Sequence, residues 1–208
     1  MGIGRLAFLK RFGAALASGA AGSRQAVVVR GDVYVNRALG VGFTKPRGWT
    51  LLSARQFEAL RHDQVFRDEE LSEVLRQESE PLAVVTRGSF GDDDFEPAIT
   101  VYVEPLEDWG SDRLVDCLPL QDSVYQRILK DYRRVGEPRE TTVSGCDAID
   151  YGSEFLFEVH KRKAMARCRT LIVVRAPQMY TVALFDYPEL GREATHEFDR
   201  FVSSFCLV

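Results

Sequence analysis

Apolar and polar residues alternate most regularly between residues 149 and 186, where the pattern predicts three successive antiparallel strands. An apolar period of two is typical of a half-buried strand. The first run, 149–159, and the second, 164–175, are separated by a charged break at 160–163. We expect Phe155 to face Cys168, because this register places both apolar sets on one face of the sheet.

The opposite face of these strands is predicted to be charged at one end and apolar at the other. The same register puts Glu154 opposite Arg169, an opposite-charge pair. A turn at 176–179, containing Pro177, leads to a third strand, in which Val182 should lie opposite Val173. Because both faces carry apolar residues, both need a cover, and the sequence predicts an α+β fold: a three-layer α/β/α sandwich with a mainly antiparallel sheet.

Further strands are expected over 27–35 (as one or two short strands), 82–86, 98–104 and 139–143. The stretch around Gly40 and Gly42 predicts a short strand that ends at Pro46, followed by a turn and a buried Trp49. It lacks the spacing of either glycine-rich phosphate-binding motif.

Helices are expected after Ser53, at 69–77, over 111–132 and after Pro188. Ser53 and Gln56 have the spacing of a capping box. Apolar residues repeat with helical spacing in the third and last of these segments, which indicates faces that pack on the core: Val124, Ile128, Leu129 and Tyr132 in one, and Leu190, Ala194, Phe198, Phe201, Val202 and Phe205 in the other.

The chain has 208 residues, 45% of them hydrophobic and 28% charged, which suits one domain at 27–208 preceded by a leader or tail at 1–26. The net charge of -4 does not favour broad binding to nucleic acid or anionic membranes. No stretch approaches the roughly 20 apolar residues of a transmembrane helix.

Residues 1–26 combine a basic start with a run of small, mildly apolar residues, and resemble an export signal. Around Arg5 the pattern is similar to a twin-arginine leader, with Leu6 in place of the second arginine. This predicts a periplasmic or otherwise exported protein. The alternative is an N-terminal tail on a cytoplasmic protein.

Residues that could carry chemistry do not form a recognisable motif, so we assign no catalytic, cofactor-binding or metal-binding residue. The cysteines, Cys117, Cys146, Cys168 and Cys206, include no CxxC pair, and the histidines, His62, His160 and His196, are dispersed. Cys168 is expected in the core and the histidines at the surface. The carboxylates Asp147, Asp150, Glu154 and Glu158 are expected to pair with Arg167 and Arg169.

Two other features leave alternatives open. The acidic loop with Asp92, Asp94 and Glu96 offers oxygen ligands of the kind that calcium takes, but lacks EF-hand spacing. Trp109 lies between a strand and a helix, where it would be either a core residue or an exposed anchor for a partner.

The order of elements resembles the PsbP-like superfamily, over about residues 33–207. The resemblance is carried by three stretches: Phe43-Thr44-Lys45-Pro46-Arg47-Gly48-Trp49, the strands Leu171-Ile172-Val173-Val174 and Tyr180-Thr181-Val182, and a closing helix with Phe198, Phe201, Ser204 and Phe205. The superfamily includes the photosystem II protein PsbP and the Ran-binding Mog-type proteins. The resemblance implies an α/β/α sandwich with a non-catalytic docking role.

We therefore expect an exported, non-enzymatic protein-interaction or scaffold domain, whose partner is another protein and not nucleic acid. The alternatives are a periplasmic domain that binds a small ligand or a metal, and an enzyme whose site forms only in the fold.

Overall fold

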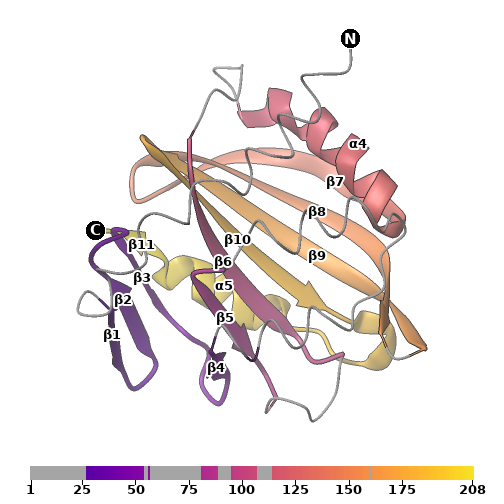
Figure 1. Cartoon of the computed structure of the whole chain (residues 1–208), viewed down its shortest axis with the longest axis horizontal. Coiled ribbons are helices and arrows are strands. Elements are labelled where there is room, and N and C mark those ends of the chain that lie inside the picture. The colour runs from indigo at the N-terminus through magenta and orange to yellow at the C-terminus, as the bar shows by residue number, and fades with distance from the viewer. Residues whose placement is uncertain (1–26, 54–55, 57–80, 89–94, 107–113, 160) are drawn as a thin grey trace.

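The computed structural model describes residues 27–53, 56, 81–88, 95–106, 114–159 and 161–208. Its centre is a seven-stranded sheet in which all neighbours are antiparallel, in the order β4-β5-β6-β10-β9-β8-β7 (Figure 1). The strands are β4 (Thr50–Leu52), β5 (Ala83–Thr86), β6 (Ala98–Pro105), β7 (Lys130–Val143), β8 (Cys146–Val159), β9 (Arg162–Arg175) and β10 (Gln178–Asp186).

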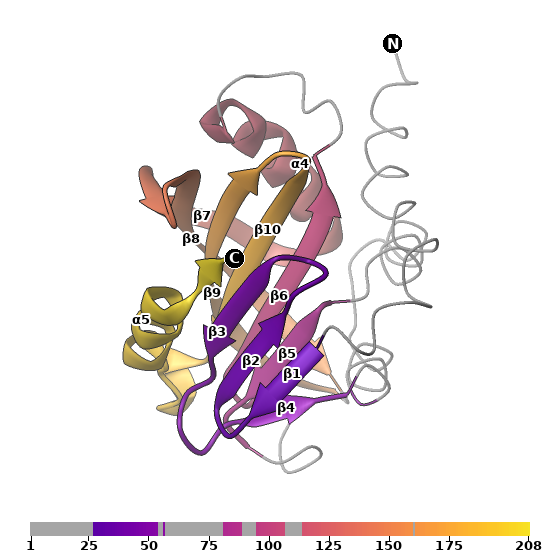
Figure 2. The same ribbon diagram turned by 90° about the vertical axis from the view of Figure 1, so that its left-hand side faces the viewer.

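A second, four-stranded sheet lies beside the first, in the order β1-β2-β3-β11 (Figure 2). Its strands are β1 (Val27–Arg30), β2 (Val33–Asn36), β3 (Val41–Thr44) and β11 (Cys206–Leu207). The sequence predicted strands in the first part of this region, but it did not predict that they form a separate sheet with the far end of the chain.

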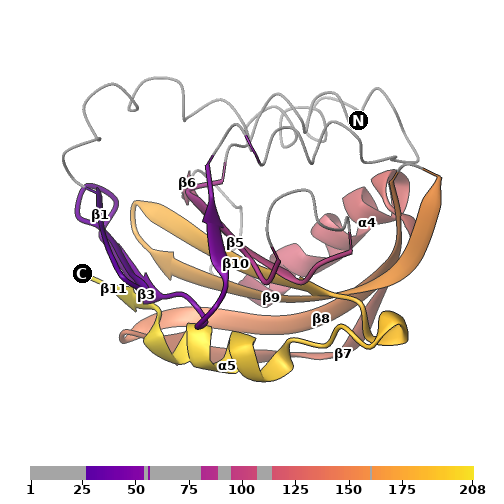
Figure 3. The same cartoon turned by 90° about the horizontal axis from the view of Figure 1, so that it is seen from below.

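Helices lie on both faces of the large sheet (Figure 3). Helix α5 (Thr195–Ser204) covers one face, and the short turn η2 (Leu114–Cys117) leads into helix α4 (Leu118–Ile128) on the other. Another short turn, η3 (Pro188–Leu190), precedes α5. The predicted α+β fold with a mainly antiparallel sheet between helical layers is confirmed.

Both long hairpins are shifted by two residues from the predicted register. Phe155 pairs with Ala166 instead of Cys168, because the turn contains two residues and not four, with Lys161 at φ 66°. Since a shift of two keeps every side chain on its face, Phe155, Ala166 and Cys168 still share one core cluster. The shift corrects the pairing of Glu154, which lies opposite Arg167 and not Arg169.

The second hairpin turns over Ala176 and Pro177, which are joined by a cis peptide bond, so that Arg175 pairs with Gln178. Val182 consequently lies opposite Leu171 and not Val173. All three of these apolar residues belong to the core under α5, as the apolar end of that face requires.

The middle of the chain differs most from prediction. The helix spans only 118–128, and strand β7 begins at Lys130 and not at Arg139, so that Tyr132 lies in a strand. Two register shifts in the β7–β8 ladder interrupt the alternation that would identify a strand. Pro138 falls in β7, which is tolerable because β7 is an edge strand.

The predicted packing of the final helix is confirmed, with one exception. Phe198 and Phe201 are fully buried and Phe205 nearly so, whereas Leu190 is 47% exposed because it lies in η3 and not in α5. Trp49 is buried as predicted. The capping box is also confirmed: Gln56 accepts from the Ser53 backbone N–H at 3.0 Å. The helical segments expected at 57–60 and 69–77 lie outside the described residues.

Candidate interaction surface

Strand β1 forms an exposed apolar edge of the small sheet. It pairs with β2 on one side, and Val28 and Val29 are 46% and 53% exposed. Consecutive side chains of a strand point to opposite faces. Both faces of this edge therefore meet solvent, and Val33 on the adjoining strand, 46% exposed, extends the apolar surface.

The β1–β2 hairpin is held in place by its turn and by one end of β1. Gly31 has φ 60°, a conformation that glycine adopts without steric cost. Next to it, Asp32 accepts from Lys45 at 2.6 Å, and its carbonyl accepts from the Lys45 N–H at 2.8 Å. Val27 packs against the core under α5. The exposed Val28 and Val29 therefore lie on a strand that is fixed to the rest of the protein.

The edge at β7 is built differently. It is 14 residues long, but it contains Pro138 and two register shifts. Lys130, Arg133 and Arg139 form ion pairs with acidic residues of β8. Proline, charge and irregular pairing are the usual means of keeping other strands off a sheet edge. Strand β1 has neither proline nor a register shift, so it is the less protected edge.

Two arginines lie near the ends of β1. Arg30 is its last residue, and Arg37 follows Asn36, which pairs with Val27 at the other end. Both arginines are exposed, and within the described part of the chain neither has an acidic partner. The edge is therefore apolar in its middle and positively charged towards its ends.

On the α4 face of the large sheet, Glu104 is a partly buried carboxyl group. Among the described residues it has no hydrogen-bond or ion-pair partner, and burial raises its pKa from 4.5 to about 7. Its charge is in turn one of the smaller causes that raise the pKa of Tyr125 on α4, after burial of that phenol. Glu104 is a titratable group that sequence analysis did not single out.

We expect Glu104→Gln to raise the free energy of unfolding at pH 8 by about 1–2 kcal/mol, a reduced value because the carboxyl group is only partly buried. The Glu104 carboxyl group binds a proton more tightly in the folded protein than in the unfolded chain. The free energy of unfolding of the wild type therefore falls as the pH rises from 4.5 to about 7. Urea unfolding at pH 4 and pH 8 measures this: the variant should match the wild type at pH 4 and exceed it at pH 8. Glu189→Gln, at an exposed position, is the control, and equal gains at both pH values would contradict the prediction.

The other unusual groups on this face are neutral and hydrogen-bonded. Burial raises the pKa of Tyr132 and Tyr151, whose hydroxyls donate to Asp122 at 2.7 Å and to Gln121 at 3.0 Å. Burial also raises the pKa of the Cys168 thiol to about 11. Cys168 is therefore a core residue, as predicted, and not an activated nucleophile.

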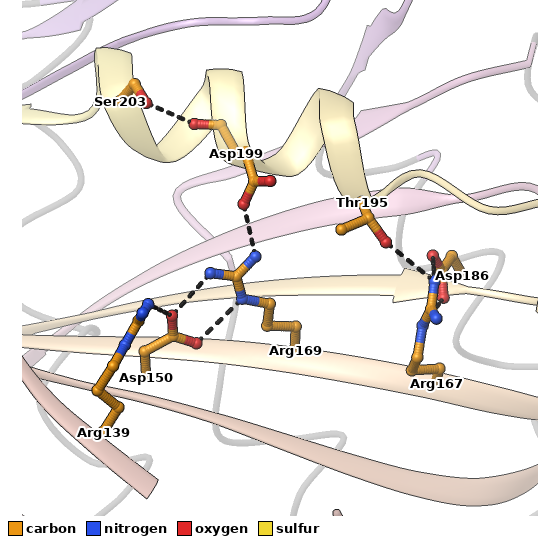
Figure 4. A network of polar contacts seen from close by, with 8 residues as sticks. All are labelled: Arg139, Asp150, Arg167, Arg169, Asp186, Thr195, Asp199 and Ser203. Carbon is orange, nitrogen blue, oxygen red and sulfur yellow. Dashed lines mark hydrogen bonds and ion pairs between the residues drawn. The ribbon is translucent and has the colours of Figure 1, made fainter. Parts of the chain in front are cut away.

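On the α5 face, Asp150 and Arg169 form the centre of an ion-pair network (Figure 4). Asp150 accepts from Arg169 at 2.7 and 3.0 Å and from Arg139 at 2.9 Å, while Arg169 also donates to Asp199 of α5 at 2.6 Å. Burial would raise the pKa of Asp150, but its two arginines outweigh this and lower it. The network joins three strands to the helix.

A second ion pair fixes the start of α5. Asp186 is fully buried and accepts from Arg167 at 2.7 and 2.9 Å and from the Ala194 N–H at 2.9 Å. Arg167 reaches on to the Thr195 hydroxyl at 3.1 Å (Figure 4). Of the carboxylates expected to pair with Arg167 or Arg169, Asp150 does so, whereas Glu154 pairs with Arg133 and Glu158 with Lys130. The partner of Arg167 is Asp186, which was not among the expected residues.

Several residues considered for chemistry can now be placed. His196 is exposed, no disulfide joins any of the four cysteines, and Glu96 pairs with Arg192 at 3.0 Å. His62, His160, Asp92, Asp94 and Trp109 lie outside the described residues. Within the described ranges no three potential metal-ligating residues form a group, and no helix is long and apolar enough to cross a membrane.

The exposed β1 edge was missed by the sequence analysis, although a signal was present. Val27, Val28 and Val29 are consecutive, so they do not alternate with polar residues. In a strand with one solvated face, such a run places at least one valine in solvent. The sequence could not show whether a neighbouring strand covers them.

Comparisons with known proteins found only distant structural likenesses. No family model and no curated protein matches the chain. A solved structure of LpqN, involved in cell envelope biogenesis of Mycobacterium tuberculosis, is 9% identical, with a TM-score of 0.48 over 80% of this chain and 82% of that one. Cyanobacterial PsbP from Synechocystis sp. PCC 6803 is 12% identical, with a TM-score of 0.47 over 87% and 95%. Likenesses at these scores and identities assign the chain neither a family nor a function.

Proposed function

We propose that the chain is a non-enzymatic interaction domain that binds another protein at the edge of its small sheet. The observation that carries this proposal is the exposure of Val28 and Val29 on opposite faces of the edge strand β1. An exposed apolar edge strand is costly to leave open, because it invites association with other chains.

The state of the reactive groups supports a non-enzymatic role. The buried or half-buried carboxylates Asp150 and Asp186 on the α5 face are bound to arginines, and burial in the core raises the pKa of the Cys168 thiol. Catalytic groups usually have pKa values matched to proton transfer or nucleophilic attack. Burial raises the pKa of the Glu104 carboxyl to about 7, and among the described residues no nucleophile or base is hydrogen-bonded to it.

A photo-reactive amino acid at position 29 should cross-link to a partner protein, whereas one at position 135 should not. Val135 is a matched control, since it is 43% exposed and lies on the protected edge strand β7. The measurement is mass spectrometry of cross-linked products from extracts of the source cells. We expect Val29→Lys to reduce capture at neighbouring position 28 at least about tenfold, because it places a charge in an apolar contact, and Val135→Lys to leave it unchanged. Equal cross-linking to partner proteins from positions 29 and 135 would contradict the proposal.

We further propose that the protein acts outside the cytoplasm. This rests on the basic and small-residue pattern of residues 1–26. The mass of the mature N-terminus, measured on protein from the source cells, tests it: a chain that begins at residue 1 or 2 in the cytoplasm contradicts export.

A further inference from the structure

We infer that the partner contributes an extended segment, apolar in its middle and acidic at its ends, that pairs with β1 as a fifth strand of the small sheet. The inference rests on the proposed function and specifies the partner's chemistry. It follows from the backbone, the side chains and the charges of one four-residue edge.

The backbone of β1 provides the pairing groups. Its four residues are all paired with β2, from Val27 with Asn36 to Arg30 with Val33. Because the hydrogen-bonding groups of a strand alternate in direction, those directed away from β2 remain for a further strand. At about 3.3 Å per residue, the edge accommodates a segment of roughly four paired residues.

The exposed side chains favour an apolar strand over other occupants. An added strand lies about 4.8 Å from β1 and has side chains on both faces of the sheet. It would cover Val28 on one face and Val29 on the other in a single pairing. A helix or a flat surface could cover only one face, so the two-sided exposure points to strand addition.

The charges define the ends of the partner segment. Arg30 and Arg37 are exposed near opposite ends of β1 and have no acidic partner among the described residues. The nearest carboxylate in the hairpin, Asp32, is already paired with Lys45. An acidic residue just outside the apolar middle of the added segment would lie beside Arg30, where opposite charges across neighbouring strands are favourable. Arg37 follows β2, one strand further in, and would attract an acidic residue at the other end over a longer distance.

The same charges disfavour a second copy of this chain as the occupant. Symmetric antiparallel pairing of two β1 strands would place Val28 against a second copy's Val29, which is apolar and compatible. It would also gather two copies of Arg30 and two of Arg37 at one interface without a free acidic residue of the hairpin. Like charges at an interface oppose association.

The test uses two synthetic seven-residue peptides with the same all-valine middle, which is apolar on both faces of a strand, one with glutamate and one with lysine at both ends. Fluorescence anisotropy with the full chain at low salt should show the glutamate peptide binding at least about tenfold more tightly, a preference that weakens with added salt. Binding should slow hydrogen exchange at β1 amides. Methylation of the glutamate peptide's backbone nitrogens on its pairing edge should abolish binding.

Charge reversal at the arginines provides the matched variants. Arg30→Glu with Arg37→Glu should reverse the preference in favour of the lysine peptide, while Arg200→Glu, at an exposed position of α5, should leave it unchanged. Equal affinity of the two peptides, no measurable binding of either, or protection elsewhere than β1 overturns the inference. So does a cross-link from position 29 to a second copy or to residues 1–26 of the same chain.

The two proposals can fail separately. Capture of another protein from position 29, combined with peptides that do not discriminate, leaves the interaction domain standing and removes strand addition. Absence of any site-specific capture at position 29 removes the interaction domain, and the inference falls with it.

Discussion

Replacing Phe201 by alanine is expected to lower the free energy of unfolding by about 3–5 kcal/mol, the range for deleting a buried aromatic side chain. Phe201 is fully buried, and its ring lies 4.8 Å from that of Phe43 in the small sheet. It therefore joins α5, the small sheet and the large sheet in one cluster. Urea denaturation followed by circular dichroism measures the effect.

Leu190→Ala is the control for this prediction. Leu190 belongs to the apolar pattern that predicted the helix, but it is 47% exposed in η3. Its replacement should change the free energy of unfolding by no more than about 0.5 kcal/mol. Similar losses in the two variants would contradict the packing of α5 described above.

Asp186→Ala should cost about 2–4 kcal/mol of unfolding free energy. The change leaves the Ala194 N–H without its acceptor and deprives Arg167 of its charged partner. Loss of one member of a buried pair is strongly destabilising. Here the cost is moderated because the Arg167 side chain is 36% exposed and can be partly hydrated.

Asp199→Ala removes a carboxylate of the same α5 face that is 53% exposed and bound to Arg169. Because exposed ion pairs contribute little, this variant should lose less than about 1 kcal/mol. Thermal and urea unfolding of both variants, at neutral pH, makes the comparison. If Asp186→Ala lowers the free energy of unfolding by less than about 1 kcal/mol, the buried Asp186 carboxylate does not hold the start of α5 in place.

The sequence predicted the layers of the fold because strand faces follow from alternation alone. Phe155 and Cys168 were assigned to the correct face even though their partners were misplaced by two residues. The length of a tight turn decides the partner, and charged residues such as Arg162 are equally acceptable in a turn and in a strand. Faces were therefore predictable, but turn lengths were not.

Only the end of strand β7, residues 139–143, was predicted, because the earlier part of the strand is irregular. Two register shifts, Gly136 with φ 72°, and Pro138 disrupt the pattern by which strands are identified. Those features protect an edge, so their detection requires the partner strand, β8, to be known. For the same reason the sequence assigned Tyr132 to a helix.

The candidate surface was the least predictable feature, because exposure depends on contacts between segments far apart in the chain. The run of valines from Val27 to Val29 would suit a fully buried strand equally well. Its exposure follows from the position of β1 at the edge of a small sheet completed by β11. Glu104 could not be singled out from the sequence either, since only the fold shows that this carboxyl group has no ion-pair partner among the described residues.

The small sheet has a consequence for the order in which the protein is built during translation. The Ser204 hydroxyl accepts from the backbone N–H of Thr44, 160 positions earlier, and β11 pairs with β3. Contacts of such long sequence separation form slowly. Nascent strands β1–β3 therefore leave the ribosome long before α5 and β11 exist to cover them, and the first sheet to be synthesised is the last to be completed.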